Sequence, residues 1–218
     1  MYEAVFFDLD GTLADTAPDL GGALNALRHE QGLAALEMAI LRPHVSAGTR
    51  GMLGVGFGLK PADSGYASLA ERFLQLYEQR LCVGTELFAG MAALLEELEA
   101  LGVAWGIVTN KPQRFTLPLV AALGLATRSA ATVSGDSAAQ PKPAPDILLL
   151  AAQIVAVPPA NAVYVGDDLR DIQAAKAAGM HAVAAAWGYL GDGPDITSWN
   201  ADFIADHPEE ILSRLDKP

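Results

Sequence analysis

The sequence contains one cysteine, Cys82, so no disulfide can form within its 218 residues. A chain without disulfides suits a reducing compartment, and we expect a cytoplasmic protein. The longest apolar stretch, residues 147–157, is interrupted by Gln153 and is too short to cross a bilayer. Residues 1–10 lack the basic segment of a signal peptide. We therefore expect neither a secreted protein held together by disulfides nor a protein with helical membrane spans.

Positive charge is also scarce, with 14 Lys and Arg against 26 Asp and Glu, which gives a net charge of −12. A negative protein repels phosphate groups, so we expect no nucleic-acid partner and no attachment to anionic membrane surfaces. A small phosphorylated substrate would need positive charge placed locally at its site. With 51% hydrophobic and 18% charged residues, the chain can form the folded core of one or two domains.

Two aspartates, Asp8 and Asp10, follow the apolar run of residues 4–7 within the segment F-F-D-L-D-G-T-L-A-D-T. An apolar run of this length that ends in a glycine turn predicts a buried strand. Open α/β sheets bind ligands at the carboxyl ends of their strands, where these carboxylates would lie. Two acidic groups so close repel each other, and a metal ion, a shared proton or both would stabilise them. On this motif alone, an acidic turn after an edge strand is an open alternative.

Strand-like and helix-like segments alternate along the chain, except in one block. Residues 16–83 contain no convincing strand and predict helices near 18–31, 35–45 and 61–81, with a glycine-rich passage at 48–58 between the last two. The later alternation predicts strands at 103–109, 130–134, 162–165 and 181–186, and helices at 91–101, 113–123, from 144, at 169–178 and at 208–215. The predicted fold class is α/β: a Rossmann-like parallel-sheet core of residues 1–15 and 84–218, with an inserted α-helical domain at 16–83.

Polar residues follow two of the later strands. Thr109 and Asn110 end the strand at 103–109, and a hydroxyl with neighbouring backbone N–H groups can hold phosphate oxygens without adding charge. Lys142 stands between two prolines, which restrict its backbone. A restrained ammonium group suits a bound phosphoryl group. Taken alone, a Thr-Asn turn and a solvated loop lysine are the simpler interpretations.

Three aspartates, Asp167, Asp168 and Asp171, lie where the strand at 162–165 gives way to the next helix. Carboxylates are common at helix N-termini, so capping accounts for one or two of them but not for all three. Together with the two N-terminal aspartates, they would supply the oxygen-rich, partly hydrated shell that Mg²⁺ prefers. The order of these sites and their shared place at strand ends indicate a single metal-dependent site.

In these motifs the chain resembles the haloacid dehalogenase superfamily, in particular its phosphatases with a helical cap after the first strand. D-L-D-G-T-L-A-D-T is similar to the family's first motif, I-V-T-N-K to its second, the P-K-P segment to its third and G-D-D-L-R-D to its fourth. The chain looks most like the phosphoglycolate phosphatase group. V-T-N-K-P-Q-R-F, V-G-D-D-L-R-D-I and W-G-Y are also similar to N-acetylmuramic acid 6-phosphate phosphatases. Asp168 stands where many members carry Ser or Thr.

The resemblance implies a phosphoric monoester hydrolase that works through an aspartyl-phosphate. Asp8 would be the nucleophile. Asp10 would be the general acid and then the base, and a like charge nearby would favour its protonated form. Thr109 and Lys142 would stabilise the charge on the phosphoryl oxygens, with Asn110 binding phosphate beside them.

The resemblance also implies Mg²⁺ as cofactor. The ion would be held by the Asp8 carboxylate, the main-chain carbonyl of Asp10 and Asp167, while Asp171 would act through water. The expected activity is Mg²⁺-dependent hydrolysis of a small phosphomonoester such as phosphoglycolate. N-acetylmuramic acid 6-phosphate, in cell-wall recycling, is the alternative substrate. The enzyme is expected to be a monomer or a homodimer.

Substrate choice is expected to lie in the inserted cap, because the core reads only the phosphoryl group. The passage 42–50 would face the site, where Arg50 would pair with a substrate carboxylate; a solvated arginine at the start of a helix is the alternative. His44 is expected at the surface. The segment 187–189 would shape the pocket wall. Gly84, in the second connection between cap and core, would serve as a hinge for cap closure.

Three other functions share parts of this pattern. A sugar phosphomutase of the same superfamily would return the phosphoryl group to a sugar and release no phosphate. A haloacid dehalogenase would use Asp8 without a metal and would lack Asp10. A phospho-accepting signalling module of receiver type would lack the insertion 16–83, and its aspartyl-phosphate would persist.

Overall fold

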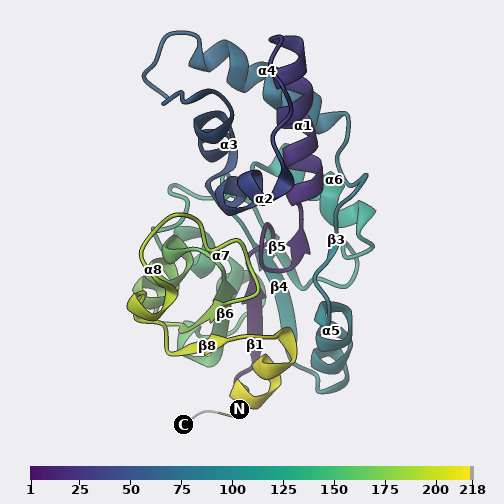
Figure 1. Cartoon of the computed structure of the whole chain (residues 1–218). Helices are drawn as coiled ribbons and strands as arrows, with labels where there is room; N and C mark the ends of the chain where they lie inside the picture. Colours follow the sequence, from purple (N-terminus) through teal and green to yellow (C-terminus); the bar gives the residue numbers. More distant parts are fainter. Residues whose placement is uncertain (217–218) are drawn as a thin grey trace.

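Six parallel strands form the central sheet, in the order β5-β4-β1-β6-β7-β8 (Figure 1). The computed structural model describes residues 1–216. The strands are β1 (Ala4–Phe7), β4 (Ala104–Val108), β5 (Ala131–Val133), β6 (Ala162–Gly166), β7 (His181–Ala185) and β8 (Phe203–Ala205). The predicted α/β class with a parallel sheet is confirmed. The prediction omits β8, a strand of three residues.

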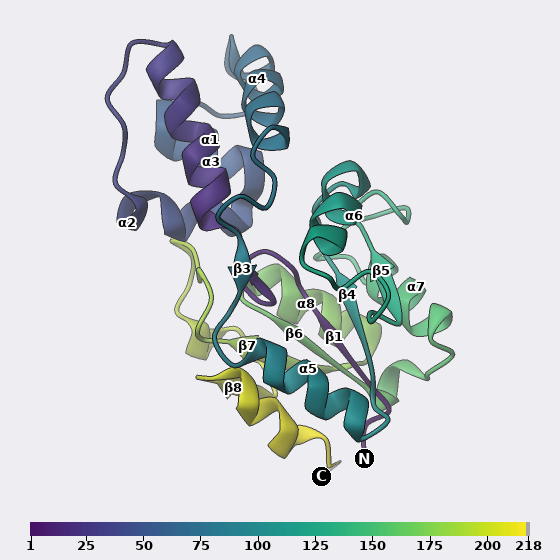
Figure 2. The same ribbon diagram turned by 90° about the vertical axis from the view of Figure 1, so that its right-hand side faces the viewer.

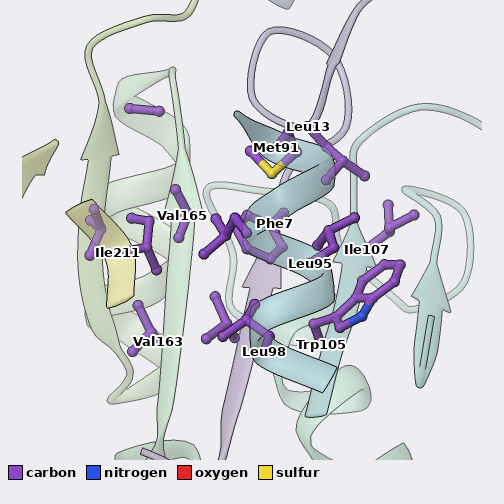
Figure 3. Packing of buried hydrophobic residues seen from close by; sticks show 14 of the residues in the cluster. Phe7, Leu13, Met91, Leu95, Leu98, Trp105, Ile107, Val163, Val165 and Ile211 are labelled. Atoms are coloured by element: carbon purple, nitrogen blue, oxygen red, sulfur yellow. The ribbon is translucent and has the colours of Figure 1, made fainter. Parts of the chain in front are cut away.

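Helices cover both faces of the sheet (Figure 2). They are α5 (Met91–Ala100), α6 (Gln113–Ala122), α7 (Asp146–Ile154), α8 (Leu169–Ala178) and the 3₁₀ helix η4 (Pro208–Arg214). Phe7 of β1 packs with Leu95 and Leu98 of α5 on one face (Figure 3). Its neighbour Phe6 packs on the opposite face with residues of α7 such as Ile147. Burial of each such side chain contributes about 1.5–3 kcal/mol to the stability of the fold. The packed core therefore holds the ends of the strands in place.

The inserted block forms a group of helices at one end of the sheet (Figure 1). It contains α1 (Ala17–Glu30), α2 (Met38–Leu41), the 3₁₀ helix η1 (Arg42–Ala47), α3 (Gly48–Phe57) and α4 (Tyr66–Glu78). These helices share a third apolar cluster that includes Leu24, Leu53 and Phe73. Two short antiparallel strands, β2 (Ala14–Asp15) and β3 (Glu86–Leu87), connect them to the core (Figure 2). We propose that residues 16–83 are the cap domain and that 1–15 and 84–216 belong to the catalytic core; residues 217–218 of the predicted core lie outside the described residues.

The glycine-rich passage at 48–58, predicted to separate two helices, folds largely as helix α3. The prediction is wrong because it relied on the low helix propensity of glycine, which costs about 1 kcal/mol relative to alanine. Packing outweighs that cost here. A Cβ on Gly56 would lie 2.7 Å from Leu24 Cδ1, and one on Gly51 would lie 2.2 Å from the carbonyl oxygen of His44. The glycines therefore let α3 approach α1 and η1 closely.

The predicted hinge residue Gly84 is held by a buried carboxylate. Asp19, in the first turn of α1, is fully buried. Its oxygens accept hydrogen bonds from the backbone N–H groups of Gly84, at 3.0 Å, and of Thr85, at 2.9 Å. The Thr85 hydroxyl donates a further bond at 2.7 Å. The second connection is thus fastened to α1, and rotation at Gly84 would have to break these bonds.

Gly84→Pro is expected to lower both turnover and stability. Proline removes the Gly84 N–H group, which is one of the donors to the buried Asp19 carboxylate, and the loss of a hydrogen bond to a charged group costs about 1.5–3 kcal/mol. Steady-state kinetics and thermal unfolding would measure the two effects. Gly84→Ala keeps the N–H group and is the matched control. A proline variant with full activity and an unchanged melting temperature would remove this contact from the account.

Candidate active site

The residues predicted to act on phosphate gather around one cavity, between the carboxyl ends of the strands and the cap helices. Asp8 follows β1, Thr109 follows β4 and Asp167 follows β6. The cavity has a volume of about 330 Å³, and its walls include Asp8, Asp10, Thr109, Asn110, Lys142 and Asp171. Because the strands are parallel, residues more than 150 positions apart meet at one edge of the sheet.

Asp8 lines this cavity with one of its carboxylate oxygens uncommitted. Oδ1 accepts hydrogen bonds from the main-chain N–H of Leu9 at 2.8 Å and from Lys142 Nζ at 2.9 Å. Within residues 1–216, Oδ2 accepts no hydrogen bond. An oxygen that is fixed through its neighbour and is itself unpartnered is well suited to attack phosphorus.

Lys142 is the cation that faces Asp8. Its ammonium lies 2.9 Å from Asp8, 2.6 Å from Asp171 and 2.9 Å from the Tyr164 hydroxyl, and only 3% of its side chain is exposed. Burial alone would lower the pKa of Lys142, but the two carboxylates raise it, so the charge persists. The Asn110 amide accepts from Lys142 N at 2.8 Å and donates to its carbonyl at 2.9 Å. Asn110 therefore positions Lys142.

Three buried carboxylates offer a site for a cation. Oxygens of Asp8, Asp167 and Asp171 lie within 4.8 Å of one another. Burial, together with the charges of the other two, raises the pKa of Asp167 to about 8, and burial also raises that of Asp171. A divalent ion would remove this repulsion, so the donor set fits a hard cation. The side chain of Asp10 is outside the cluster, and the resemblance assigns it only a main-chain carbonyl.

The oxygens of Asp167 and Asp171 differ in their availability. Asp171 Oδ1 accepts from Lys142 Nζ, and Oδ2 accepts from the backbone N–H of Asp168 at 3.0 Å. Both oxygens are thus engaged, which suits contact with an ion through water. Asp167 Oδ1 accepts from the Thr12 hydroxyl at 3.0 Å, and Oδ2 accepts from the Ser46 hydroxyl at 2.9 Å. Oδ2 also accepts from the backbone N–H of Tyr189 at 2.9 Å, whereas Oδ1 accepts only from a hydroxyl that can turn away, so Asp167 Oδ1 is free to bind an ion directly.

Asp10 lies beside a cation that the sequence reasoning left without a role. Lys111 Nζ is 2.7 Å from Asp10 Oδ1 and 3.0 Å from Oδ2, and the Thr16 hydroxyl donates to Oδ1 at 2.6 Å. The ammonium also lies 4.9 Å from the centre of the Tyr77 ring of the cap. The contacts of the Asp10 side chain are to a cation and a hydroxyl, whereas from the sequence we expect a like charge to control its proton.

Arg50 does not line the catalytic cavity. It is exposed, and it borders a neighbouring hollow of about 360 Å³. His44 borders the same hollow, with Nδ1 3.1 Å from Asp192. Ser46 and Arg170 border both the cavity and the hollow. Recognition of a substrate carboxylate by Arg50 stays a prediction. It requires the part of the substrate that carries the carboxylate to extend from the cavity into the neighbouring hollow.

Comparison with known proteins identifies this arrangement. Residues 5–185 match the family described as haloacid dehalogenase-like hydrolases. The chain belongs to this family. It is 47% identical over 209 residues to a phosphoglycolate phosphatase of Xanthomonas campestris, covering 95% of this chain and 94% of that protein. It is 40% identical over 213 residues to an N-acetylmuramic acid 6-phosphate phosphatase of Pseudomonas putida, covering 98% of this chain and 96% of that protein.

The solved structures agree with the family. A crystal structure described as a predicted phosphoglycolate phosphatase from Haemophilus somnus superposes with a TM-score of 0.85 at 25% identity, covering 99% of this chain and 98% of that one. The protein is thus a phosphoric monoester hydrolase. Phosphatases of this family generally use a divalent metal, and the buried aspartate cluster could hold one. No helix within residues 1–216 is long and apolar enough to cross a membrane.

In this phosphatase Tyr189 connects the acidic cluster to the cap. Its backbone N–H donates to Asp167 Oδ2 at 2.9 Å. Its hydroxyl donates to Asp15 of β2 at 2.8 Å and accepts from the backbone N–H of Ala17, in the first turn of α1, at 2.9 Å. The segment 187–189, expected in the pocket wall, does not line the cavity. Tyr189 instead fixes the first connection between core and cap.

Sequence reasoning overlooked several polar residues of the phosphatase site. Lys111 and Arg170 stand inside quoted motifs, which was the available signal, but their charges were given no role. Ser46 lies in the quoted cap passage. Tyr164 donates to the carbonyl oxygen of Val108 at 2.8 Å and supports Lys142, yet it occupies an ordinary strand position. Nothing in the local sequence distinguishes such a tyrosine from a core residue.

Proposed function

We propose that the phosphatase hydrolyses the phosphate monoester of a small, carboxylate-bearing metabolite, with Asp8 as its nucleophile. The uncommitted Asp8 Oδ2, between the buried Lys142 and the acidic cluster, is the observation that carries this proposal. A signalling module would need the aspartyl-phosphate to persist. Here Asp10, which would activate water, lines the same cavity as Asp8. The reducing environment suggested by the single Cys82 supports a cytoplasmic enzyme.

The chemistry divides one difficult displacement into two. Asp8 Oδ2 attacks phosphorus, the ester P–O bond breaks, and the leaving alkoxide takes a proton from Asp10. A water molecule then gives its proton to Asp10 and attacks the aspartyl-phosphate, which releases phosphate and restores Asp8. General acid–base help contributes about 10²–10⁴-fold, against accelerations up to about 10²¹ for monoesters. Charge stabilisation by Lys142 and Thr109 must therefore provide a larger share.

We propose Mg²⁺ as the metal. The residues that would hold it are Asp8, Asp167 and the main-chain carbonyl of Asp10, with Asp171 one water molecule away. When bound, the ion would neutralise charge on the phosphoryl oxygens. An all-oxygen site that leaves room for several waters favours Mg²⁺ over softer metals.

Two carboxylate-bearing substrates are supported by different observations. The 47% identity to the Xanthomonas phosphatase supports phosphoglycolate. The cavity supports N-acetylmuramic acid 6-phosphate, the substrate in the name of the Pseudomonas relative. Its volume of about 330 Å³ falls in the range of sites for drug-sized ligands, roughly 300–1,000 Å³. Its apolar wall contains Leu20, Val45, Phe73, Leu74 and Phe115. A two-carbon acid would leave this wall uncovered, whereas a sugar with acetyl and lactyl groups would cover it.

Phosphate release from a panel of esters would test this proposal. In the presence of Mg²⁺, we expect a kcat/KM for N-acetylmuramic acid 6-phosphate at least 100-fold above that for phosphoglycolate, or about 2.7 kcal/mol of differential transition-state binding. The reverse preference would assign phosphoglycolate. Isomerisation of a sugar phosphate without phosphate release would indicate a phosphomutase. Release from none of the esters would refute the proposed function.

A further inference from the structure

Among the described residues 1–216, three cations border the catalytic cavity: Lys111, Lys142 and Arg170. Lys111 and Lys142 are committed to Asp10 and to the nucleophile, and only 6% and 3% of their side chains are exposed. The side chain of Arg170 is 29% exposed. An anionic group on the substrate beyond the phosphoryl group therefore has one accessible cation in the cavity wall.

Arg170 is also held in one orientation. Its Nε and Nη2 donate to the two carboxylate oxygens of Asp168, both at 2.8 Å, and Nη2 donates to the main-chain carbonyl of Ser46 at 2.8 Å. Ser46 belongs to the cap and Asp168 to the core, so the guanidinium bridges both parts. Within residues 1–216, Nη1 donates no hydrogen bond. The structure therefore leaves a fixed guanidinium nitrogen with two unused donors.

We propose that Nη1 of Arg170 binds the carboxylate of the leaving group, with Asp168 as the residue that positions Arg170. This inference rests on the proposed function. Guanidinium groups bind carboxylates with directed, charge-assisted hydrogen bonds, and an arginine already fixed loses little rotamer freedom on binding. The carboxylates in the cavity wall disfavour a second dianionic phosphoryl group more strongly than a monoanionic carboxylate. Arg50 is exposed and lies outside the cavity, so it is the weaker candidate.

The role of Asp168 follows from its two contacts. Its Oδ1 accepts from the backbone N–H of Arg170 at 2.9 Å and so caps the N-terminus of α8. Serine would cap this helix equally well but could not pair with a guanidinium group. Asp168 therefore caps the N-terminus of α8, as a serine would, and in addition it fixes Arg170.

Substrate pairs that differ only in the carboxylate would test the inference. N-acetylmuramic acid 6-phosphate is compared with the primary amide of its lactyl carboxylate, and phosphoglycolate with the primary amide of its carboxylate. In Arg170→Gln, we expect KM for the esters with a carboxylate to rise about tenfold or more, while their kcat stays nearly unchanged. For the esters without the carboxylate, we expect both KM and kcat to stay nearly unchanged. Asp168→Ser should give a smaller rise, because the helix cap remains. Arg170→Lys, which keeps the charge, should fall between wild type and Arg170→Gln.

Arg72→Gln is the matched control. Arg72 makes a similar two-point pair with Glu30, at 2.9 and 2.6 Å, and does not line the cavity, so Arg72→Gln should leave both members of each substrate pair unaffected. If Arg170→Gln slows both members equally, Arg170 only holds the cap and the inference is refuted. Loss of discrimination in Arg50→Gln but not in Arg170→Gln would also refute it and would support Arg50. A wild-type enzyme that releases phosphate from no ester would refute the proposed function instead.

Discussion

Asp8→Asn is expected to abolish phosphate release while the protein stays folded. The amide oxygen still accepts from Leu9 N and Lys142, so the local hydrogen bonds survive. The amide nitrogen is no nucleophile, and the covalent route is lost. We expect kcat to fall by at least about 10⁴-fold, which is roughly 5 kcal/mol in activation free energy. Phosphate release and the melting temperature would be measured together, and the melting temperature should not fall.

Asp10→Asn is the informative companion to that variant. It keeps the nucleophile but removes the group that would activate water, so a substrate with a good leaving group should leave the aspartyl-phosphate trapped. Mass spectrometry of the rapidly quenched protein would detect the phosphorylated chain in Asp10→Asn and not in Asp8→Asn. Phosphate release that survives Asp8→Asn would mean that another group attacks phosphorus.

The sequence predicted the strand-end residues because their positions follow from topology alone. In a parallel sheet every carboxyl end faces the same edge, so Asp8, Thr109 and Asp167 had to meet once the strands were recognised. The ion pairs that the two buried lysines of the site make with aspartates could not be predicted in the same way. Lys111 reaches Asp10 from 101 positions away, and that contact depends on loop geometry after β4 rather than on any periodicity.

The structure of the cap could be predicted only in part from the sequence. Its glycines were interpreted through their backbone freedom, whereas in α3 their small size is what matters. Once 48–57 is a helix, the direction of Arg50 is fixed by the helix face that packs against α1, and Arg50 lies on the exposed side. A loop would have left that direction open. The carboxylate-binding role of Arg50 stays a prediction, and this position in the first turn of α3 is the one that its alternative, a solvated arginine at the start of a helix, describes.

Mg²⁺ is expected to stabilise the wild-type protein and to leave Asp167→Asn unaffected. At about 100 times its dissociation constant, a ligand that binds only the folded state adds about 2.7 kcal/mol. For a chain of this size, that corresponds to a rise in melting temperature of roughly 5–10 °C. In the variant, the amide oxygen can accept from Ser46 and Tyr189, and the amide nitrogen can donate to the Thr12 hydroxyl. The local hydrogen bonds therefore survive without the charge. Thermal unfolding with Mg²⁺ or with EDTA would measure the difference.

The same variant should be more stable than wild type when no metal is bound. The pKa of Asp167 is raised in the folded protein, to about 8, so its ionisation opposes folding. Without metal, the contribution of Asp167 to the free energy of unfolding should fall as the pH rises above its unfolded pKa of about 3.9, and should level off near pH 8. Asp167→Asn removes that part of the pH dependence. A metal-free variant less stable than wild type at pH 7 would show that hydrogen bonds, rather than charge repulsion, govern this carboxylate. Charge repulsion in the aspartate cluster would thus destabilise the metal-free protein, and a bound cation would remove that repulsion and stabilise the fold. This combination is expected of a cation-binding site.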